Sequence, residues 1–317
     1  MPPLSQNATR YSLSPSGIER YLSCPRQYFY AQQLQLNEKK PSLAQLFGLS
    51  VHALMEATLL SDSPSLKTLQ AYQHNLFEVP LAESLPTRTL ERVQLSLEQS
   101  TRIRRLQLQN HLQLAFESLD AIGFFSQFLP QYNVHATEKW VTLETPFDID
   151  LLGLNGRIDV LLQHRQSGRF LILDYKTSRT QYKKSLDKNL VDFEAKILAP
   201  IDWENPIYSD RFKKRHLQLP FYWLMLKQQP NFKTVDVGLQ LIRPQVFGNC
   251  DTLIVRDETL QNTLKDLQKT LETGLLNRLN GPQPFEALGS KVICGQCEYK
   301  NICPKGLESN QDEEGDE

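Results

Sequence analysis

The chain has 317 residues, a mass of 36.6 kDa and an ordinary globular composition, with 40% hydrophobic and 22% charged residues. This length allows one elaborated domain or two small ones. No apolar run approaches the roughly 18 residues that cross a bilayer, and the N-terminus lacks the basic and apolar regions of a signal peptide, so we expect a cytoplasmic protein without a membrane partner. Six of the 36 acidic residues lie in the last ten positions, so the formal net charge of −1 hides a mildly basic body.

Helical signals dominate the first 130 residues. The pair Ser14-Pro15, a hydroxyl cap followed by proline, predicts a helix that ends near Cys24, because Cys24 precedes another proline. A second helix is predicted over residues 48–59. Residues 87–120 show helical spacing without proline or glycine, which predicts one long or two shorter amphipathic helices.

Strand signals follow residue 130. Three segments rich in β-branched and aliphatic residues predict strands, at 140–143, 156–162 and 169–176. A turn-like stretch between the last two predicts that they form a hairpin. Further along, the pattern predicts a helix, a strand and a second helical stretch, at 217–228, 235–241 and 257–280. The expected fold class is therefore α/β, with a helical N-terminal elaboration.

Two aspartates and a lysine converge at the end of this hairpin. If the turn centres on Gln166 and Ser167, paired residues have numbers that add to 333, which places Asp159 opposite Asp174. Their Cβ atoms would lie about 5 Å apart, close enough for both carboxylates to hold one divalent cation, and Lys176 would emerge on the same face. The hairpin is otherwise aliphatic on both faces, which implies that helices cover the sheet on both sides.

This arrangement suits metal-assisted hydrolysis of a phosphodiester. The ion would polarise the phosphate and lower the pKa of a bound water, while Lys176 positions that water or neutralises developing charge. An aspartate at a strand end and a solvated Asp-Lys pair without a catalytic role would produce the same sequence pattern. The hairpin alone therefore leaves both interpretations open.

Six segments occur in one order along the chain: 14–25, 48–52, 156–159, 174–176, 218–222 and 294–303. Together they resemble the RecB-like branch of the PD-(D/E)XK nucleases, which includes the AddB-type exonucleases and the CRISPR adaptation nucleases. The resemblance runs from about Tyr11 to Gly306 and implies a restriction-endonuclease-like mixed sheet flanked by helices. It suggests a helical part at 1–130 with the first cluster ligand, a nuclease core and C-terminal cluster segment at 131–306, and a disordered acidic tail at 307–317.

The resemblance also implies a metal site. Asp159 and Asp174 would bind the catalytic ion, Mg²⁺ or Mn²⁺, with His52 as a further ligand, and Lys176 would be the active-site lysine. The family often has glutamate where Asp174 stands, which moves the ligand without changing its chemistry. His52 shares a helix face with Glu56, whose carboxylate could fix the imidazole tautomer, although a lone histidine on such a helix is more often structural.

Gln218 and Tyr222 match the supporting motif of the same family. They are neighbours at i and i+4 on the predicted helix, so both can address one site. Core packing by Tyr222 with Gln218 exposed is the alternative.

Four of the five cysteines point to a bound metal group. Cys294 and Cys297 have chelating CxxC spacing, and Cys303 is followed by proline as in ferredoxin-like ligand runs. Cys24 is the natural fourth ligand, and the resembling family holds a [4Fe-4S] cluster on this arrangement. Zinc is the alternative, because tetrahedral sulfur sites also suit it. Cys250 stands apart and is expected to be a plain apolar side chain.

Two basic segments flank the predicted catalytic strands. Residues 179–188 and 211–216 could follow a phosphate backbone, with Tyr182 and Phe212 available to stack on bases. A pair of solvated loops is the alternative.

The sequence therefore predicts a metal-dependent DNA exonuclease of repair or recombination, acting on single-stranded DNA or duplex ends. No Gly-Lys dipeptide occurs, which excludes a Walker A loop, so any unwinding would come from a helicase partner. Two alternatives remain open: a DNA-end-binding scaffold subunit of a helicase–nuclease complex with little activity of its own, and a redox or zinc module for which DNA is incidental.

Overall fold

The computed structural model describes residues 11–36, 42–78, 87–98, 100–144, 146, 152–177, 186–198, 217–244, 250–281, 285–287, 294 and 297–304. The acidic tail and both basic segments, apart from the backbone of residues 186–188, lie outside these ranges, so the predictions made for them stay predictions.

A six-stranded mixed sheet forms the centre of the fold. Its strands are β1 (Tyr11–Leu13), β2 (Tyr132–Leu143), β3 (Leu152–His164), β4 (Phe170–Lys176), β5 (Val235–Leu241) and β6 (Thr252–Val255). Antiparallel β2 follows one edge of β3. The other edge is shared by parallel β1, which pairs as far as Leu154, and by antiparallel β4, which pairs from Val160 onward. β4 then pairs parallel with β5, and β5 antiparallel with β6.

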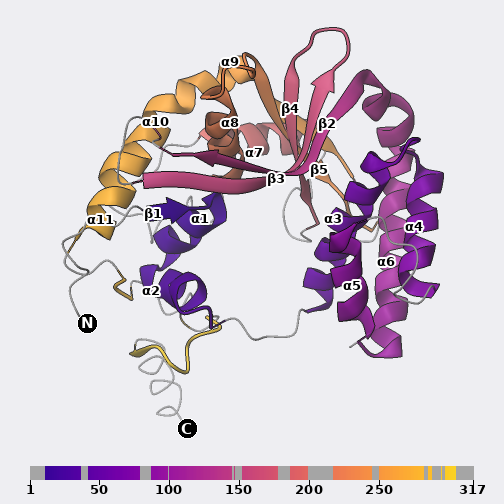
Figure 1. Cartoon of the computed structure of the whole chain (residues 1–317), viewed down its shortest axis with the longest axis horizontal. Coiled ribbons are helices and arrows are strands. Elements are labelled where there is room, and N and C mark those ends of the chain that lie inside the picture. The colour runs from indigo at the N-terminus through magenta and orange to yellow at the C-terminus, as the bar shows by residue number, and fades with distance from the viewer. Residues whose placement is uncertain are drawn as a thin grey trace.

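Helices cover both faces of the sheet (Figure 1). Those of the first half are α1 (Pro15–Ser23), α2 (Pro25–Tyr28), α3 (Leu43–Leu60), α4 (Leu66–Glu78), α5 (Arg88–Glu98) and α6 (Arg102–Ala121). Those of the second half are α7 (Leu186–Leu198), α8 (Gln218–Lys227), α9 (Asp257–Leu260), α10 (Leu264–Lys269) and α11 (Asn277–Leu279). Short π- and 3-10 segments continue several of them: η1 (Phe29–Gln33), η2 (Phe124–Phe128), η3 (Leu129–Gln131), η7 (Gln261–Thr263) and η8 (Thr270–Leu276).

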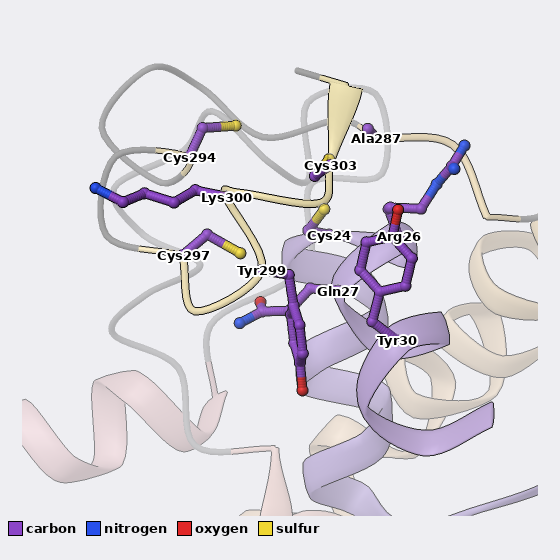
Figure 2. A pocket seen from close by; sticks show the side chains of 10 residues that line it. All are labelled: Cys24, Arg26, Gln27, Tyr30, Ala287, Cys294, Cys297, Tyr299, Lys300 and Cys303. Carbon is purple, nitrogen blue, oxygen red and sulfur yellow. The ribbon is translucent and has the colours of Figure 1, made fainter. Parts of the chain in front are cut away.

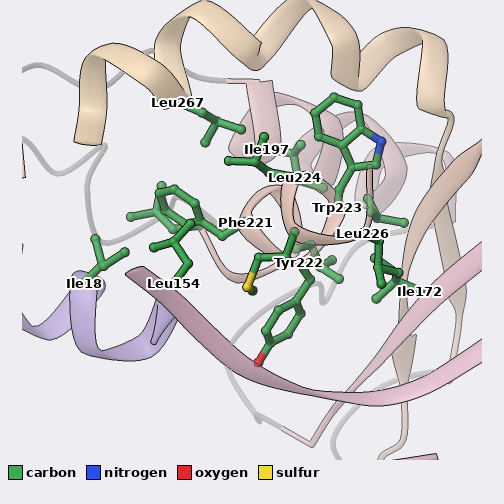
Figure 3. Packing of buried hydrophobic residues seen from close by; sticks show 14 of the residues in the cluster. Ile18, Leu154, Ile172, Ile197, Phe221, Tyr222, Trp223, Leu224, Leu226 and Leu267 are labelled. Carbon is green, nitrogen blue, oxygen red and sulfur yellow. The ribbon is translucent and has the colours of Figure 1, made fainter. Parts of the chain in front are cut away.

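The β3–β4 hairpin separates two hydrophobic cores, as predicted. Val160 and Leu173 belong to the core built with α3–α6. Leu161 and Ile172 belong to the other core, where α8 contributes Phe221, Tyr222 and Trp223 alongside residues of α1, α7 and α10 (Figure 3). The alternation of strand side chains fixes which functional groups face each core.

Local signals explain the helix ends. The Ser14 side chain accepts a hydrogen bond from the backbone N–H of Gly17, and α1 stops before Cys24, as predicted. Helix α3 begins five residues earlier than predicted, because a capping box between Ser42 and Gln45 starts it. The predicted helical stretch at 87–120 is two helices, α5 and α6.

Several elements were not predicted, among them α2, β1, β6, α4 and α7. β1 and β6 have three and four residues, too few for a periodic signal. Helix α4 was not recognised, and α7 begins in the basic segment 179–188, where no helix was predicted. In the described chain, β1 also brings residues of the predicted helical part into the sheet.

Helix α3 corrects one prediction made from the sequence. It is long and apolar enough to cross a membrane, contrary to the prediction that no segment is, yet 56% of this stretch is buried inside the protein. Such burial is what the core helix of a soluble domain shows.

A close approach of β3 to α8 positions the site. Gly156 lies under the ring of Tyr222, and a Cβ atom built on it would be 2.4 Å from Cε1 of that ring. No side chain fits there, so the glycine lets α8 approach the strand that carries Asp159.

We expect Gly156→Ala to lower the free energy of unfolding by about 1–3 kcal/mol, because the buried ring must move to admit the methyl group. The measurement is the urea midpoint at constant m-value. Gly48→Ala is the matched control: its nearest neighbour is Oγ1 of Thr177 at 3.2 Å, and alanine is the better helix former in α3. Equal midpoints for the two variants would contradict the close-packing account.

Candidate metal centre

The hairpin has the predicted register. Val160 pairs with Leu173 and Leu161 with Ile172, so paired numbers add to 333. The ladder ends at Val160–Leu173, one step before the expected Asp159–Asp174 pair. Oδ2 of Asp159 accepts a hydrogen bond from the backbone N–H of Tyr175 at 2.8 Å. The two aspartates therefore lie where the strands part.

His52, Glu138 and Asp159 form one compact group. Nδ1 of His52 lies 3.2 Å from Oδ1 of Asp159 and 3.9 Å from Oε1 of Glu138. One ligand atom from each residue lies within 4.8 Å of the other two. The ring of Tyr175 packs edge-on against the imidazole at a centroid distance of 5.6 Å, which supports the orientation of His52 from α3.

The sequence did not point to Glu138. It lies in β2 between Thr137, which pairs with Val160, and Lys139, which pairs with Ile158, so it stands across from Asp159. Its φ of +46° is in the left-handed region that non-glycine residues rarely adopt. Only the β2–β3 register could have identified it, and the predicted strand began too late to include it.

Asp174 and Lys176 form a second, adjoining group. Nζ of Lys176 lies 2.6 Å from Oδ2 of Asp174 and donates a hydrogen bond to Oε1 of Gln218 at 2.9 Å. Nε2 of Gln218 in turn donates to the hydroxyl of Tyr222 at 3.1 Å. The predicted pair on α8 therefore reaches the predicted lysine, and Tyr222 is buried while Gln218 is only partly exposed.

Glu19 is a further, partly buried carboxylate that the sequence did not single out. It projects from α1, and its Oε1 accepts a hydrogen bond from the backbone N–H of Leu217 at 3.1 Å, at the start of α8. The charges of Lys176 and Asp174 act on it. Glu19 thus joins the helix that ends at Cys24 to the helix that supports the lysine.

Two sequence expectations differ in detail. Among the described residues, Asp174 is not part of the compact group of His52, Glu138 and Asp159; its carboxylate faces Lys176 instead. The carboxylates nearest His52 are those of Asp159 and Glu138, whereas Glu56, one turn away on α3, has a buried oxygen without a hydrogen-bond partner.

The carboxylates differ in proton affinity. Burial, together with the charge of Asp159, raises the pKa of Glu138 to about 7, against the opposing charges of Arg157 and His52. Burial raises the pKa of Asp174 to about 6 although Lys176 opposes it. Burial alone would lower the pKa of His52 and raise that of Asp159, but their mutual attraction and hydrogen bond reverse both directions.

The residues fit a divalent cation. Oε2 of Glu138 and Oδ2 of Asp174 are buried without a hydrogen-bond partner, although each lies 2.6 Å from a cationic nitrogen, of Arg157 and Lys176 respectively. Two carboxylates and an imidazole are ligands suited to Mn²⁺, and carboxylates to Mg²⁺. A cation here would add positive charge beside two buried carboxylates whose pKa values are raised although Arg157 and Lys176 already lie against them.

The four predicted cluster cysteines line one pocket (Figure 2). It lies between the end of α1 and the C-terminal segment, and the nearby thiols of Cys24 and Cys303 help burial to raise the pKa of Cys297. All five cysteines are in the described ranges, and none is in a disulfide. No three of the thiols lie within 4.8 Å of one another. A tetrahedral zinc site would need sulfur atoms about 3.8 Å apart, so the described thiols do not form one. They are not gathered as an iron-sulfur cluster site either.

Several contacts dock the C-terminal segment on the N-terminal helices. Nε of Arg26 donates a hydrogen bond to the carbonyl of Phe285 at 2.7 Å, and the rings of Tyr30 and Tyr299 lie 5.4 Å apart. Cys250, in contrast, is buried in the core with α3–α6, and its thiol also hydrogen-bonds to the backbone of Arg243, so it is not the plain apolar side chain that was predicted.

Comparisons with known proteins show the family. The sequence model of the PD-(D/E)XK nuclease superfamily matches residues 12–304. The chain belongs to the PD-(D/E)XK nuclease superfamily. Its members are in general metal-dependent nucleases, which implies a divalent cation and a nucleic-acid substrate. A solved structure described as "Crystal structure of SSO0001" is similar over 96% of this chain and 90% of that chain, with 13% identity and a TM-score of 0.34. No curated protein matches.

The raised pKa of Glu138 predicts that the free energy of unfolding of the metal-free protein depends on pH. The folded, metal-free protein holds a proton on Glu138 that the unfolded chain releases, so this residue's contribution to stability is present below about pH 4.5 and is lost as pH rises towards about 7. We expect Glu138→Gln to be more stable than the wild type at pH 8 without metal, with the difference vanishing at pH 4. Added Mn²⁺ should stabilise the wild type at pH 8 and the variant far less.

Urea unfolding at both pH values, with and without Mn²⁺, measures these differences. An equal gain from Mn²⁺ in both proteins would remove Glu138 from the metal centre.

Proposed function

We propose that this chain is a divalent-metal-dependent DNA exonuclease of the RecB-like branch of its superfamily, acting in the cytoplasm in repair or recombination. The observation that carries the proposal is the adjacency of two groups: His52, Glu138 and Asp159 together, and Asp174 with Lys176 beside them. A scaffold subunit without activity would not need this complete set of acidic and basic groups.

His52, Glu138 and Asp159 would hold the cation, with Asp174 as an adjoining ligand. When bound, the ion would supply positive charge at the scissile phosphate and lower the pKa of a water. The carboxylates would hold the cation where β4 leaves β3 inside the sheet.

Two acceptors position the ammonium group of Lys176 for catalysis. Asp174 keeps the ammonium charged, and Gln218 fixes its direction through a hydrogen bond of 2.9 Å. The side chain is 27% exposed, so it can also reach a phosphate oxygen or the attacking water. Tyr222 orients the Gln218 amide, which makes both α8 residues positioning residues.

The substrate is proposed to be DNA, as single strands or duplex ends, with unwinding supplied by a helicase partner. The basic body of the chain supports association with a polyanion.

We also propose that Cys24, Cys294, Cys297 and Cys303 hold a [4Fe-4S] cluster that ties the two ends of the chain together. The shared pocket, the effect of the Cys24 and Cys303 thiols on the pKa of Cys297, and the docking of the C-terminal segment support this. Closing a loop of about 270 residues stabilises a fold by roughly 5–6 kcal/mol in the chain-entropy relation.

Removing either aspartate should abolish metal-dependent cleavage. We expect Asp159→Ala and Asp174→Ala to reduce digestion of single-stranded DNA by at least about 10³-fold, because the cation loses a carboxylate. Lys176→Ala should reduce kcat strongly and leave Mn²⁺ binding nearly unchanged. The measurements are release of labelled nucleotides and calorimetric titration with Mn²⁺. Either aspartate variant digesting DNA at the wild-type rate would overturn the assignment.

The cluster proposal predicts unequal cysteines. Cys24→Ser should remove the broad absorbance near 400 nm expected of a thiolate-ligated cluster, lower the iron content and reduce Tm, because it deletes the only ligand from the N-terminal end. Cys250→Ser changes the same atoms in a buried core position and should retain colour and iron. A colourless wild type with stoichiometric zinc would replace iron by zinc. Unchanged iron in the Cys24 variant would exclude this cysteine.

A further inference from the structure

Trp140 is an exposed aromatic side chain beside the metal centre. It belongs to β2, two residues beyond Glu138, and the residue is 68% exposed. Tryptophan is expensive to leave in water, because its ring offers a large apolar area that most proteins bury. An exposed ring next to a functional site is therefore informative.

The strand register places Trp140 on the face that carries the metal centre. Trp140 pairs directly with Arg157, and the next residues along the two strands, Val141 and Ile158, point into the opposite core with α8. Side chains alternate along a strand, so Trp140 and Arg157 share the other face. Arg157 confirms this placement, since its Nε lies 2.6 Å from Oε2 of Glu138.

The two side chains form a short extension of the site. Residues two apart on a fully extended strand are about 7 Å apart, and the left-handed φ of Glu138 shortens the chain here, so the bases of the Trp140 and Glu138 side chains are at most about 7 Å apart. Nucleotides of one strand rise about 3.4 Å each along a DNA duplex and are farther apart in an unpaired strand, so this distance spans one or two nucleotides. Arg157 lies between them with a side chain that is 46% exposed and carries positive charge towards solvent.

From this placement we propose that Trp140 stacks on an unpaired base of the substrate strand, one or two nucleotides from the phosphate at the metal centre. An aromatic face next to an exposed guanidinium and a metal centre suits a nucleotide, with the base on the ring and the neighbouring phosphate near Arg157. In a duplex the faces of the bases are covered by their neighbours. The subsite therefore selects single-stranded DNA, and this specificity rests on the proposed function.

Binding measured without divalent metal tests the subsite independently of cleavage. The full chain is titrated into labelled single-stranded and blunt duplex oligonucleotides in EDTA, with fluorescence anisotropy as the readout. We expect Trp140→Ala to weaken binding of the single strand about 10-fold and binding of the duplex less than 2-fold, whereas Trp140→Phe keeps most of the affinity. Ile103→Ala, which changes a 70% exposed side chain on α6, is the matched control and should change neither.

A series of oligonucleotides that each lack one base distinguishes stacking from a purely structural role of Trp140, because a structural role would not depend on which base is missing. Single-stranded oligonucleotides lacking one base at each successive position from either end should bind the wild type less tightly at one or two positions only. Trp140→Ala should show no such position. Wild-type affinity of this variant for single strands, equal losses on single strand and duplex, or a persisting abasic penalty would each overturn the proposal.

The proposed nuclease function is tested separately from the stacking subsite. It fails if the wild type does not cleave DNA in Mg²⁺ or Mn²⁺, whatever the binding results. A wild type that cleaves, together with an alanine variant that binds normally, would refute only the stacking subsite.

Discussion

The site depends on the point where β3 and β4 part. The carboxylate of Asp159 accepts a hydrogen bond from the backbone N–H of Tyr175, so a side-chain hydrogen bond replaces the next backbone hydrogen bond of the ladder. The strands separate beyond it, and the side chains of Asp159, Asp174 and Lys176 gain room between elements that would otherwise be closely paired. Every other feature of the centre is arranged around this opening: α3 brings His52, β2 brings Glu138, and α8 brings Gln218.

The opening also places three carboxylates close together where they are largely shielded from water. Glu138, Asp159 and Asp174 are each less than a tenth exposed, and burying unpaired carboxylates is costly. His52, Arg157 and Lys176 each lie against one of them and offset part of that cost. The raised pKa values of Glu138 and Asp174 show that the compensation is incomplete. A divalent cation would complete it, so the same groups that destabilise the metal-free site would bind the ion.

The sequence revealed what is local. The hairpin register follows from its turn, so the sequence could group Asp159, Asp174 and Lys176. His52 and the α8 pair, Gln218 and Tyr222, were singled out by the family resemblance, since helix spacing alone left core packing open for that pair. Glu138, Glu19 and Trp140 were not, because their positions depend on pairings between segments distant in the chain. A left-handed residue in β2 has no sequence signature of its own, and the partner of Glu19 lies 198 positions away. Tertiary pairing of this kind is set by the whole core rather than by neighbouring residues.

The most direct test of the central claim is an anomalous difference map from crystals grown with Mn²⁺, recorded at the manganese absorption edge. The account predicts a peak within about 2.0–2.4 Å of Nδ1 or Nε2 of His52 and of carboxylate oxygens of Glu138 and Asp159. A map without a peak between these three residues at saturating Mn²⁺, or with the ion bound elsewhere, would contradict it.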